Sequence, residues 1–323
     1  MTPMGGEGGA VLALSGGIGG AKLALGLSRV MRPEQLTVVA NTGDDFEHLG
    51  LAISPDLDTL MYTLAGLSDP DKGWGRRDET WAFMAALAAL GGETWFQLGD
   101  GDLATHVERT RRLAAGELLS CITDDFCRRL GVAARILPMS EERVRTRVRC
   151  ADGWLDFQDY FVRRRSAPEV LELAYEGAAQ ARPHPAFIAA LAEPRLRAVV
   201  ICPSNPYLSV DPILALPGVR NAIKACRAPV IAVSPIIGGR AVKGPTAKMM
   251  RELGFPVAAA AVAQHYDGLI DLFVVDHGEG KISLPNVRVA KAAILMTTLA
   301  DREGLANTVL QFADELRLEV GRP

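Results

Sequence analysis

One stretch near the N-terminus, Val11-Leu-Ala-Leu-Ser15-Gly16-Gly17-Ile18-Gly19-Gly20-Ala21-Lys22, constrains the possible fold more than any other. The four apolar residues at its start predict a short buried strand, and the apolar spacing from Lys22 to Val30 predicts a helix. A strand, a glycine-rich turn and a helix point the amides of the helix N-terminus at an anion. Glycine also lets a ligand approach the backbone closely. The stretch therefore predicts a phosphate-binding turn formed by Gly16, Gly17, Gly19, Gly20 and Lys22.

Two well-known phosphate-binding motifs do not fit this turn. The dinucleotide fingerprint would need glycine at Lys22, and a P-loop would need glycine at Ala21 and Ser or Thr at Leu23. The alternative is a tight turn whose glycines serve only the packing of the strand against the helix, and the sequence leaves that alternative open.

Composition excludes several classes of protein. The chain has 323 residues and a net charge of −3, which gives no reason to expect nucleic acid as a partner. No apolar run reaches the length of about 18 residues that a membrane span needs, and residues 1–9 lack the basic and apolar blocks of a signal peptide. The five cysteines are odd in number and match no zinc motif. We therefore expect a cytoplasmic protein with reduced thiols.

A second buried strand, Leu36 to Ala40, is followed directly by Asp44 and Asp45. Ligands of a doubly wound sheet gather at the carboxyl ends of the strands, and two adjacent carboxylates there are suited to a divalent cation. The sequence thus predicts a Mg²⁺ site at Asp44 and Asp45, with a polar turn as the alternative.

Two more carboxylates follow at the start of a predicted helix. Ser54-Pro55 is typical of a helix start with proline in the first position, so Asp56 and Asp58 lie in the first turn, where carboxylates are favoured in any case. Four carboxylates after one strand repel one another unless a cation or substrate hydroxyls compensate for their charge. We therefore predict Asp56 as a substrate-binding residue.

Other candidates for the site lie in loops and on one further helix. Trp74, between two glycines, offers a planar surface for an aromatic ligand, although a tryptophan that fills the core is an equal alternative. His106 fits a ligand or a general base, but a structural histidine is more common at such a position. Strand-end loops after residues 201 and 233 carry Ser204, Asn205, Ser234 and Gly238, which we predict to join the first turn along one edge of the sheet.

The order of these segments predicts an α/β fold with a Rossmann-like three-layer core and a mostly parallel sheet. Residues 10–139 and 191–323 form the expected α/β nucleotide-binding core. Residues 140–190 interrupt the alternation and are expected to form a smaller inserted α+β subdomain. Within it, Val144–Cys150 and Trp154–Phe161 predict a hairpin, and Pro168–Ala192 predicts helices. Trp95–Leu98 is expected to be a short strand.

Several unrelated short motifs stand in order along the chain: Ser15-Gly16-Gly17, Asn41-Thr42-Gly43-Asp44-Asp45, Ile53-Ser-Pro-Asp-Leu-Asp-Thr59, Leu98-Gly-Asp-Gly-Asp-Leu-Ala-Thr-His106, Leu137-Pro-Met-Ser140, Phe157-Gln158, Pro203-Ser-Asn-Pro206 and Val233-Ser-Pro-Ile-Ile-Gly238. Together they resemble the 2-phospho-L-lactate transferase (CofD) family of coenzyme F-420 biosynthesis. The resemblance extends from about Val11 to Asp276.

The resemblance implies an enzyme that joins Fo, a 5-deazaflavin alcohol, to a phosphorylated three-carbon acid. The acid is phosphoenolpyruvate, 2-phospholactate or 3-phosphoglycerate; it arrives as a guanosine diphosphate diester, and GMP leaves. The resemblance also implies Mg²⁺, a homodimer and a core that binds the deazaflavin, and it leaves a guanylyltransferase that makes the donor as a candidate partner. Asp58 matches the aspartate at the Fo hydroxyl, and Asp45, with Asp44 beside it, matches the position on the metal side. Both Asp58 and Asp45 are therefore predicted to be catalytic.

One departure affects recognition of the acid. Gly101 stands where the family usually has arginine, so recognition of the acid passes to another arginine such as Arg76 or Arg77, or is altered. A second hypothesis is a nucleotide- or nucleotide-sugar-binding regulator related to gluconeogenesis factors, which also carry a glycine-rich first loop. Retention of a yellow deazaflavin by the purified protein would favour the enzyme.

Overall fold

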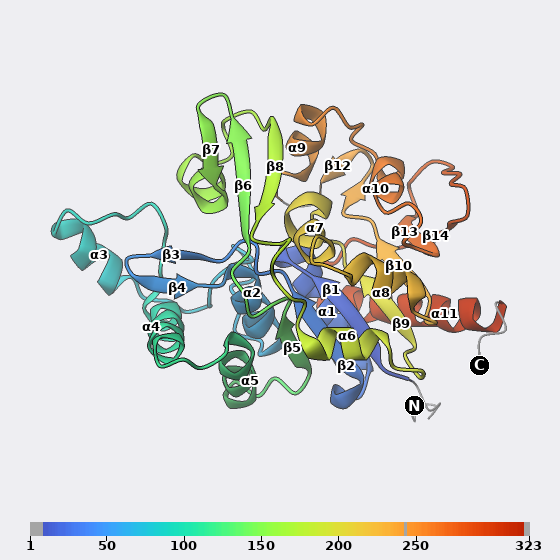
Figure 1. The fold of residues 1–323 in the computed structure, drawn as a ribbon, viewed down its shortest axis with the longest axis horizontal. Helices are drawn as coiled ribbons and strands as arrows, with labels where there is room; N and C mark the ends of the chain where they lie inside the picture. The colour runs from blue at the N-terminus through green and yellow to red at the C-terminus, as the bar shows by residue number, and fades with distance from the viewer. Residues whose placement is uncertain (1–8, 242–243, 320–323) are drawn as a thin grey trace.

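The centre of the molecule is a parallel sheet of seven strands in the order β14-β13-β10-β9-β1-β2-β5 (Figure 1). We analysed a computed structural model, which describes residues 9–241 and 244–319. The strands are β1 (Val11–Ser15), β2 (Leu36–Ala40), β5 (Arg135–Pro138), β9 (Ala198–Ile201), β10 (Val230–Val233), β13 (Leu272–Asp276) and β14 (Arg288–Ala292). Every neighbouring pair in this sheet is parallel. Strands such as β1 and β9 are continuous apolar runs because both faces of the sheet are covered.

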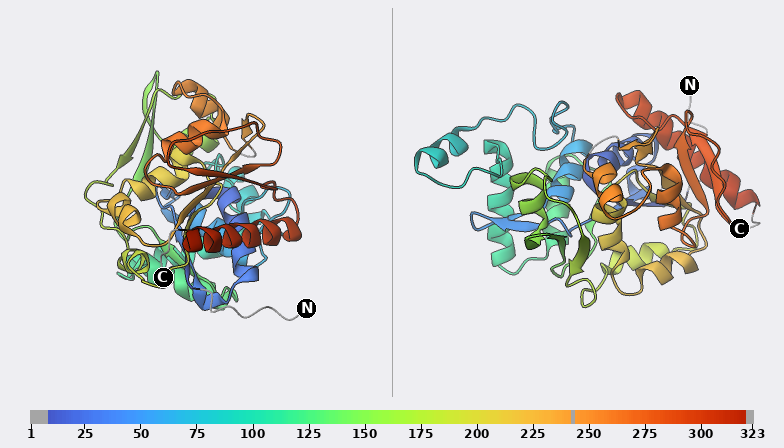
Figure 2. Two further views of the ribbon diagram at one scale, coloured as in Figure 1. Left: turned by 90° about the vertical axis from the view of Figure 1, so that its right-hand side faces the viewer. Right: turned by 90° about the horizontal axis from the view of Figure 1, so that it is seen from above.

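Helices cover both faces of the sheet and make three layers. One apolar core packs the sheet against α1 (Gly17–Val30), α2 (Pro55–Leu64), α5 (Leu119–Arg129) and α11 (Leu299–Glu319). The other face packs against α6 (Pro185–Leu191), α7 (Asp211–Leu214), α8 (Val219–Ala225), α9 (Thr246–Glu252) and α10 (Ala259–His265). Figure 2 shows α11 lying along one face of the sheet. The predicted α/β fold with a Rossmann-like three-layer core is confirmed.

The order of the strands places a topological switch point beside β1. The chain runs outward from β1 through β2 to β5, and then returns to the other side of β1 to build β9, β10, β13 and β14. Loops that leave β1 and β9 at their carboxyl ends therefore turn in opposite directions and leave a crevice between them. Ligands of open α/β sheets bind in such a crevice.

A second, antiparallel sheet, in the order β7-β6-β8, is built from residues 145–176. Strands β6 (Arg145–Cys150) and β7 (Gly153–Asp156) form the predicted hairpin. The hairpin ends earlier than predicted, because Asp159–Arg163 forms a π-helical turn. The prediction of helices throughout Pro168–Ala192 is wrong in its first half, where β8 (Glu172–Glu176) pairs with the free edge of β6. The division of the chain into a core and an inserted subdomain stays a prediction.

A third segment projects on the side of the molecule opposite α11 (Figures 1 and 2). It holds the short hairpin β3 (Phe46–His48) and β4 (Leu51–Ile53), and also α3 (Ala82–Ala89), which comes after α2 along the chain. The expected strand at Trp95–Leu98 is wrong: Trp95 and Phe96 pack edge to face against the rings of His48 and Phe46. Packing of these aromatic side chains replaces backbone pairing, so the apolar run forms no strand.

The remaining elements complete the description. They are the helix α4 (Asp100–Ala114), the 3₁₀ turn Pro33–Gln35, the π-helical turn Pro206–Val210 and the two-residue strands β11 (Ile236–Ile237) and β12 (Arg240–Ala241). All five cysteines are free thiols. Among the helices of the described ranges, none combines the length and the apolar character that crossing a membrane requires.

Candidate active site

A cavity of about 520 Å³ opens at the carboxyl ends of β1, β9 and β10, at the switch point of the sheet. Most of the residues selected from the sequence line it: Gly16, Gly17, Gly19, Lys22, Asp44, Asp56, Asp58, Trp74, His106, Ser204, Asn205 and Ser234. Three others do not. Gly20 and Asp45 lie buried just behind the lining, and Gly238 is exposed in the β11–β12 turn, where its amide donates to Glu279 at 3.3 Å.

The glycine turn, which we define as residues 16–20, starts α1 earlier than the sequence indicated. Gly16 is the N-cap residue and Gly17 the first residue of the helix. The Gly17 amide already donates to the Asp56 carboxylate at 2.6 Å. Asp56 therefore caps α1 from a neighbouring helix, and burial raises its pKa to about 6. Ile18 and Gly19, the next residues of this turn, line the cavity.

Close packing explains three of the glycines. A Cβ atom at Gly16 would lie 2.6 Å from the Asp56 carboxylate, and one at Gly19 or Gly20 would overlap the Pro203 carbonyl or the Ser204 hydroxyl. Gly17 differs, because its φ of +64° favours glycine and a Cβ atom there would meet nothing within 4 Å. The packing role considered from sequence thus accounts for Gly16, Gly19 and Gly20, while Gly17 faces open space in the cavity.

The strand-end serines and asparagine hold their loops in place. Ser204 Oγ accepts from the Gly16 amide at 3.2 Å and donates to its carbonyl at 2.8 Å, which ties the end of β9 to the glycine turn. Asn205 Oδ1 accepts from the amides of Tyr207 and Leu208. Ser234 Oγ bonds to the backbone of Ile236. The side-chain oxygens of these three residues therefore form hydrogen bonds with the backbone of the loops that make the cavity wall.

The pair Asp44 and Asp45 is buried at the end of β2. Ser54 donates to Asp45 Oδ2 at 2.8 Å, and Gln158 donates to the Asp44 carbonyl at 3.2 Å. One oxygen of each carboxyl, Oδ1, is buried with no hydrogen-bond partner among the described residues. Burial raises the pKa of Asp45 to about 7, and burial followed by the charge of Asp56 raises the pKa of Asp44 well above its usual value. Two buried oxygens without partners are ligands that a cation can use.

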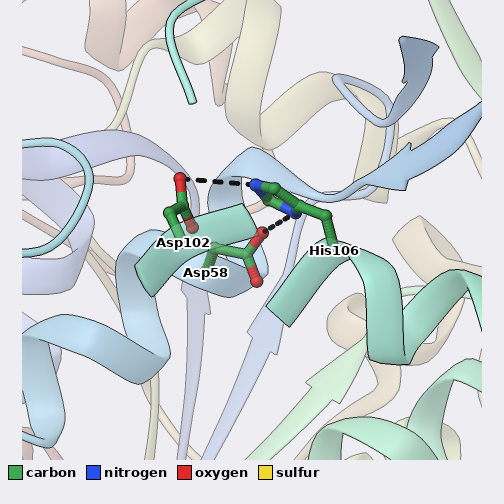
Figure 3. Close-up of side chains that lie close together, drawn as sticks. All are labelled: Asp58, Asp102 and His106. Carbon is green, nitrogen blue, oxygen red and sulfur yellow. Dashed lines mark ion pairs between the residues drawn. The ribbon is translucent and has the colours of Figure 1, made fainter. Parts of the chain in front are cut away.

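Asp58 lies in a buried network of charges between α2 and α4 (Figure 3). Arg109, one of the most buried side chains, donates hydrogen bonds to both Asp58 oxygens: Nη1 donates to Oδ2 at 3.0 Å and Nη2 donates to Oδ1. His106 lies between two carboxylates, with Nδ1 3.7 Å from Asp58 and Nε2 3.3 Å from Asp102. Tyr62 donates to the other oxygen of Asp102 at 2.7 Å.

Among the residues around Asp58, the sequence singled out His106 as a ligand or general base, whereas Asp102 and Arg109 were not singled out. Asp102, His106 and Arg109 share one face of α4 because they are spaced four and three residues apart. That spacing was visible in the sequence, but the apposition of α4 to α2 was not. Within the described ranges, Asp58, Asp102 and His106 are the one group of three ligand-type side chains whose ligand atoms lie within 4.8 Å of one another. The Arg109 guanidinium already supplies a positive charge to this group.

The remaining candidates lie at two ends of the cavity. Lys22 Nζ donates to the Met296 carbonyl at 2.8 Å, near the glycine turn. Trp74 is 43% exposed, so it lines the mouth of the cavity and does not fill the core. Of the two arginines considered in place of residue 101, Arg76 lies against the Gly101 carbonyl, at 3.4 Å, whereas Arg77 is exposed and lies near Gly66.

Comparison with known proteins agrees with this architecture. A member of the UPF0052 family from Bacillus halodurans has a similar crystal structure, with a TM-score of 0.62 over 96% of this chain and 99% of that chain, at 15% identity. That likeness shows the fold alone.

Sequence relatives are much closer. A protein named phosphoenolpyruvate transferase from Kitasatospora aureofaciens is 41% identical over 95% of this chain and 98% of its own. Proteins of the same name from Streptomyces griseus and Mycolicibacterium smegmatis are 40% and 39% identical, over 95% and 89% of this chain and 99% and 93% of their own. The profile of the 2-phospho-L-lactate transferase CofD family matches residues 11–312. The chain therefore belongs to the CofD family of transferases.

Proposed function

We propose that this protein transfers a phosphorylated three-carbon acid from a guanosine diphosphate diester to the terminal hydroxyl of the deazaflavin Fo, with release of GMP, in coenzyme F-420 biosynthesis. The observation that carries this proposal is the identity of about 40%, over almost the full length, to proteins named phosphoenolpyruvate transferase. Their name favours phosphoenolpyruvate over 2-phospholactate and 3-phosphoglycerate as the acid.

The glycine turn is the proposed site of the donor diphosphate. The amides of Ile18 and Gly19 lie in the first turn of α1, where the helix dipole favours negative charge. Lys22 lies one turn further along the same helix and lines the same cavity. Gly17 leaves the approach to these amides open. Backbone amides and a lysine together form an arrangement suited to phosphate oxygens.

Mg²⁺ is the proposed cofactor, and the residues present fit it. Asp44 and Asp45 would hold the ion, because each has a buried carboxyl oxygen without a hydrogen-bond partner in the described chain. When bound, Mg²⁺ would neutralise charge on the transferred phosphate. The raised pKa values of both carboxyls mean that a cation must displace protons, so its binding should strengthen as pH rises through about 7.

The acceptor fits the rest of the cavity. Trp74, Phe96, Phe157 and Phe161 lie on its wall and offer flat apolar surface to the deazaflavin ring. Asp58 is proposed to accept a hydrogen bond from the attacking hydroxyl. The Asp58 carboxylate is held by its place on α2 and by hydrogen bonds from Arg109, so it would orient the hydroxyl with little reorganisation of the protein.

The reaction forms one bond and breaks one. The hydroxyl oxygen of Fo attacks the phosphorus that carries the acid, and the bond from that phosphorus to the bridging oxygen of GMP breaks. The hydroxyl proton leaves by way of Asp58 or solvent. A homodimer and a guanylyltransferase that supplies the donor stay predictions of the family resemblance.

Co-binding of Fo and GDP tests the proposal against the alternative of a nucleotide-binding regulator. We expect Fo to bind, as measured by quenching of its fluorescence, and GDP to bind, as measured by calorimetry, to the same protein molecule at one site each. A protein that binds GDP or a nucleotide sugar but shows no change in Fo fluorescence would contradict the transferase and support the regulator.

A further inference from the structure

Arg76 lies beside the cavity, next to the lining residues Gly75 and Tyr62, and has no acidic partner in the described part of the chain. Its guanidinium lies 5.7 Å from the ring centroid of Tyr62, and Nη1 donates one long hydrogen bond, 3.4 Å, to the Gly101 carbonyl. By contrast, Arg109 and Arg112 on α4 pair with carboxylates at short range. A guanidinium has five N–H donors, so most of the donors of Arg76 remain for a ligand.

The backbone holds Arg76 in this position. Its neighbours are fixed by hydrogen bonds from Asp69 N to the Gly75 carbonyl, at 3.2 Å, and from Arg77 N to the Leu67 carbonyl, at 2.8 Å. Further along, the Glu79 carboxylate accepts from the amides of Gly101 and Asp102 at 2.6 and 2.8 Å. These bonds fix the backbone of the loop 67–79 and tie its end to the first turn of α4, so that the backbone of Arg76 is held in place before a ligand arrives.

The position of Arg76 relative to the glycine turn follows from α2. Asp56, Thr59 and Tyr62 on this helix all line the cavity. Asp56 bonds to Gly17 at one end, and the helical rise places Tyr62 about 9 Å further along the axis. Arg76 lies over Tyr62, and Trp74 and Gly75 of its own loop line the cavity beside it. Arg76 therefore lies at the Tyr62 end of the lining residues on α2, whereas the proposed diphosphate site lies at the Asp56 end.

We propose that Arg76 forms the subsite that binds the carboxylate of the transferred three-carbon acid. This inference rests on the proposed function, in which the donor carries that carboxylate beyond its diphosphate. Four carboxyl groups line the cavity, those of Asp44, Asp56, Asp58 and Asp102, and they are unfavourable neighbours for the carboxylate of the acid. The planar guanidinium of Arg76 is a favourable partner, because a guanidinium binds a carboxylate through two parallel hydrogen bonds.

Variants Arg76→Ala and Arg76→Lys test this subsite, with Arg77→Ala as the matched control on the exposed neighbouring side chain. Turnover is measured with the guanylylated phosphoenolpyruvate donor made in situ, and GDP and phosphoenolpyruvate are each titrated by calorimetry. For Arg76→Ala we expect the KM for the donor to rise roughly 10- to 100-fold, as for the loss of hydrogen bonds to a charged group. The KM for Fo and the Kd for GDP stay unchanged, because neither ligand carries the carboxylate.

The lysine variant separates charge from geometry. Arg76→Lys keeps a positive charge but lacks the planar pair of donors, so its KM for the donor should lie between those of the wild type and Arg76→Ala. An unchanged donor KM in Arg76→Ala overturns the inference, as does a GDP Kd that rises as much as the donor KM, which would assign Arg76 to phosphate. If the wild type makes no product with any of the three acids, the proposed function fails. In that case the calorimetric titration with phosphoenolpyruvate still tests the Arg76 subsite. Equal Kd values for phosphoenolpyruvate in the wild type and Arg76→Ala, or no binding to either, overturn the subsite.

Discussion

At the scale of single residues, the pairing of Asp58 with Arg109 changes what a mutation at Asp58 reports. Asparagine caps a helix almost as well as aspartate, so, if Asp58 only capped α2 and contacted the hydroxyl, Asp58→Asn would fold normally and slow turnover by at least roughly tenfold. In the structure the same change leaves the Arg109 guanidinium buried without its charged partner. Breaking a buried pair in this way costs about 3–5 kcal/mol. We therefore expect Asp58→Asn to lower the melting temperature as well as turnover.

The comparison that isolates this effect uses another arginine of α4. Arg111 pairs with Glu108 on the same helix, but its side chain is 64% exposed. Arg111→Gln should change stability by less than about 1 kcal/mol, while Arg109→Gln should destabilise as strongly as Asp58→Asn. Melting curves for the three variants check this. Equal melting temperatures for Arg109→Gln and Arg111→Gln would contradict the buried pair.

Asp45 gives a prediction about pH. Its pKa is raised to about 7 by burial, so the folded state binds its proton more tightly than the unfolded state does, and its contribution to stability is lost as pH rises from about 4 to 7. The shift of about three units corresponds to at most roughly 4 kcal/mol. Without divalent cations, Asp45→Asn should therefore melt at a higher temperature than the wild type at pH 8, and near the wild type at pH 5. Asp71→Asn, on the exposed loop, should show no such dependence. A lower melting temperature for Asp45→Asn at pH 8 would show that the Asp45 carboxylate stabilises the empty site.

At the scale of elements, the glycine turn separates a structural from a binding effect. Substitution at Gly19 pushes a side chain into the Pro203 carbonyl, so a loss of nucleotide binding there follows from misfolding as easily as from a lost contact. Gly17→Ala is the cleaner change, because its methyl group enters the open cavity at a strain cost of about 1 kcal/mol. Gly131→Ala, at φ +74° and outside the cavity lining, matches that strain. We expect calorimetry to show at least roughly tenfold weaker GDP binding for Gly17→Ala, as for loss of one hydrogen bond to a charged group, and unchanged binding for Gly131→Ala. Equal affinities in both variants would remove the turn from the donor site.

The elements also show what the sequence could predict. Buried parallel strands such as β1 and β10 are continuous apolar runs between turn residues, so their existence follows from pattern alone. β8 could not be predicted as easily, because Glu172 to Glu176 alternates weakly and becomes a strand only by pairing with β6. Asp56 was placed correctly in the first turn of α2, yet its bond to Gly17 depends on how α2 packs beside α1. Local features were predictable, and partners that meet across elements were not.

At the scale of the whole molecule, the site exists because the order in which strands are added to the sheet reverses beside β1. That reversal brings the glycine turn, the acidic start of α2 and the loop after β9 around one cavity. The second sheet adds the wall at Phe157, Gln158 and Phe161, and α4 adds Asp102 and His106. Residues from across the chain thus enclose a volume in which a nucleotide and a flat aromatic acceptor would approach the same carboxylates.

The most direct test of this account is the mass of the product formed by the purified protein. Fo and Mg²⁺ are incubated with the guanylylated forms of phosphoenolpyruvate, 2-phospholactate and 3-phosphoglycerate, first separately and then in equal mixture, and GMP and deazaflavin products are followed by chromatography and mass spectrometry. We expect one GMP for each molecule of product and, from the mixture, a main product that carries the phosphoenolpyruvate group. Intact Fo with all three donors, from protein that is folded and binds GDP, would contradict it.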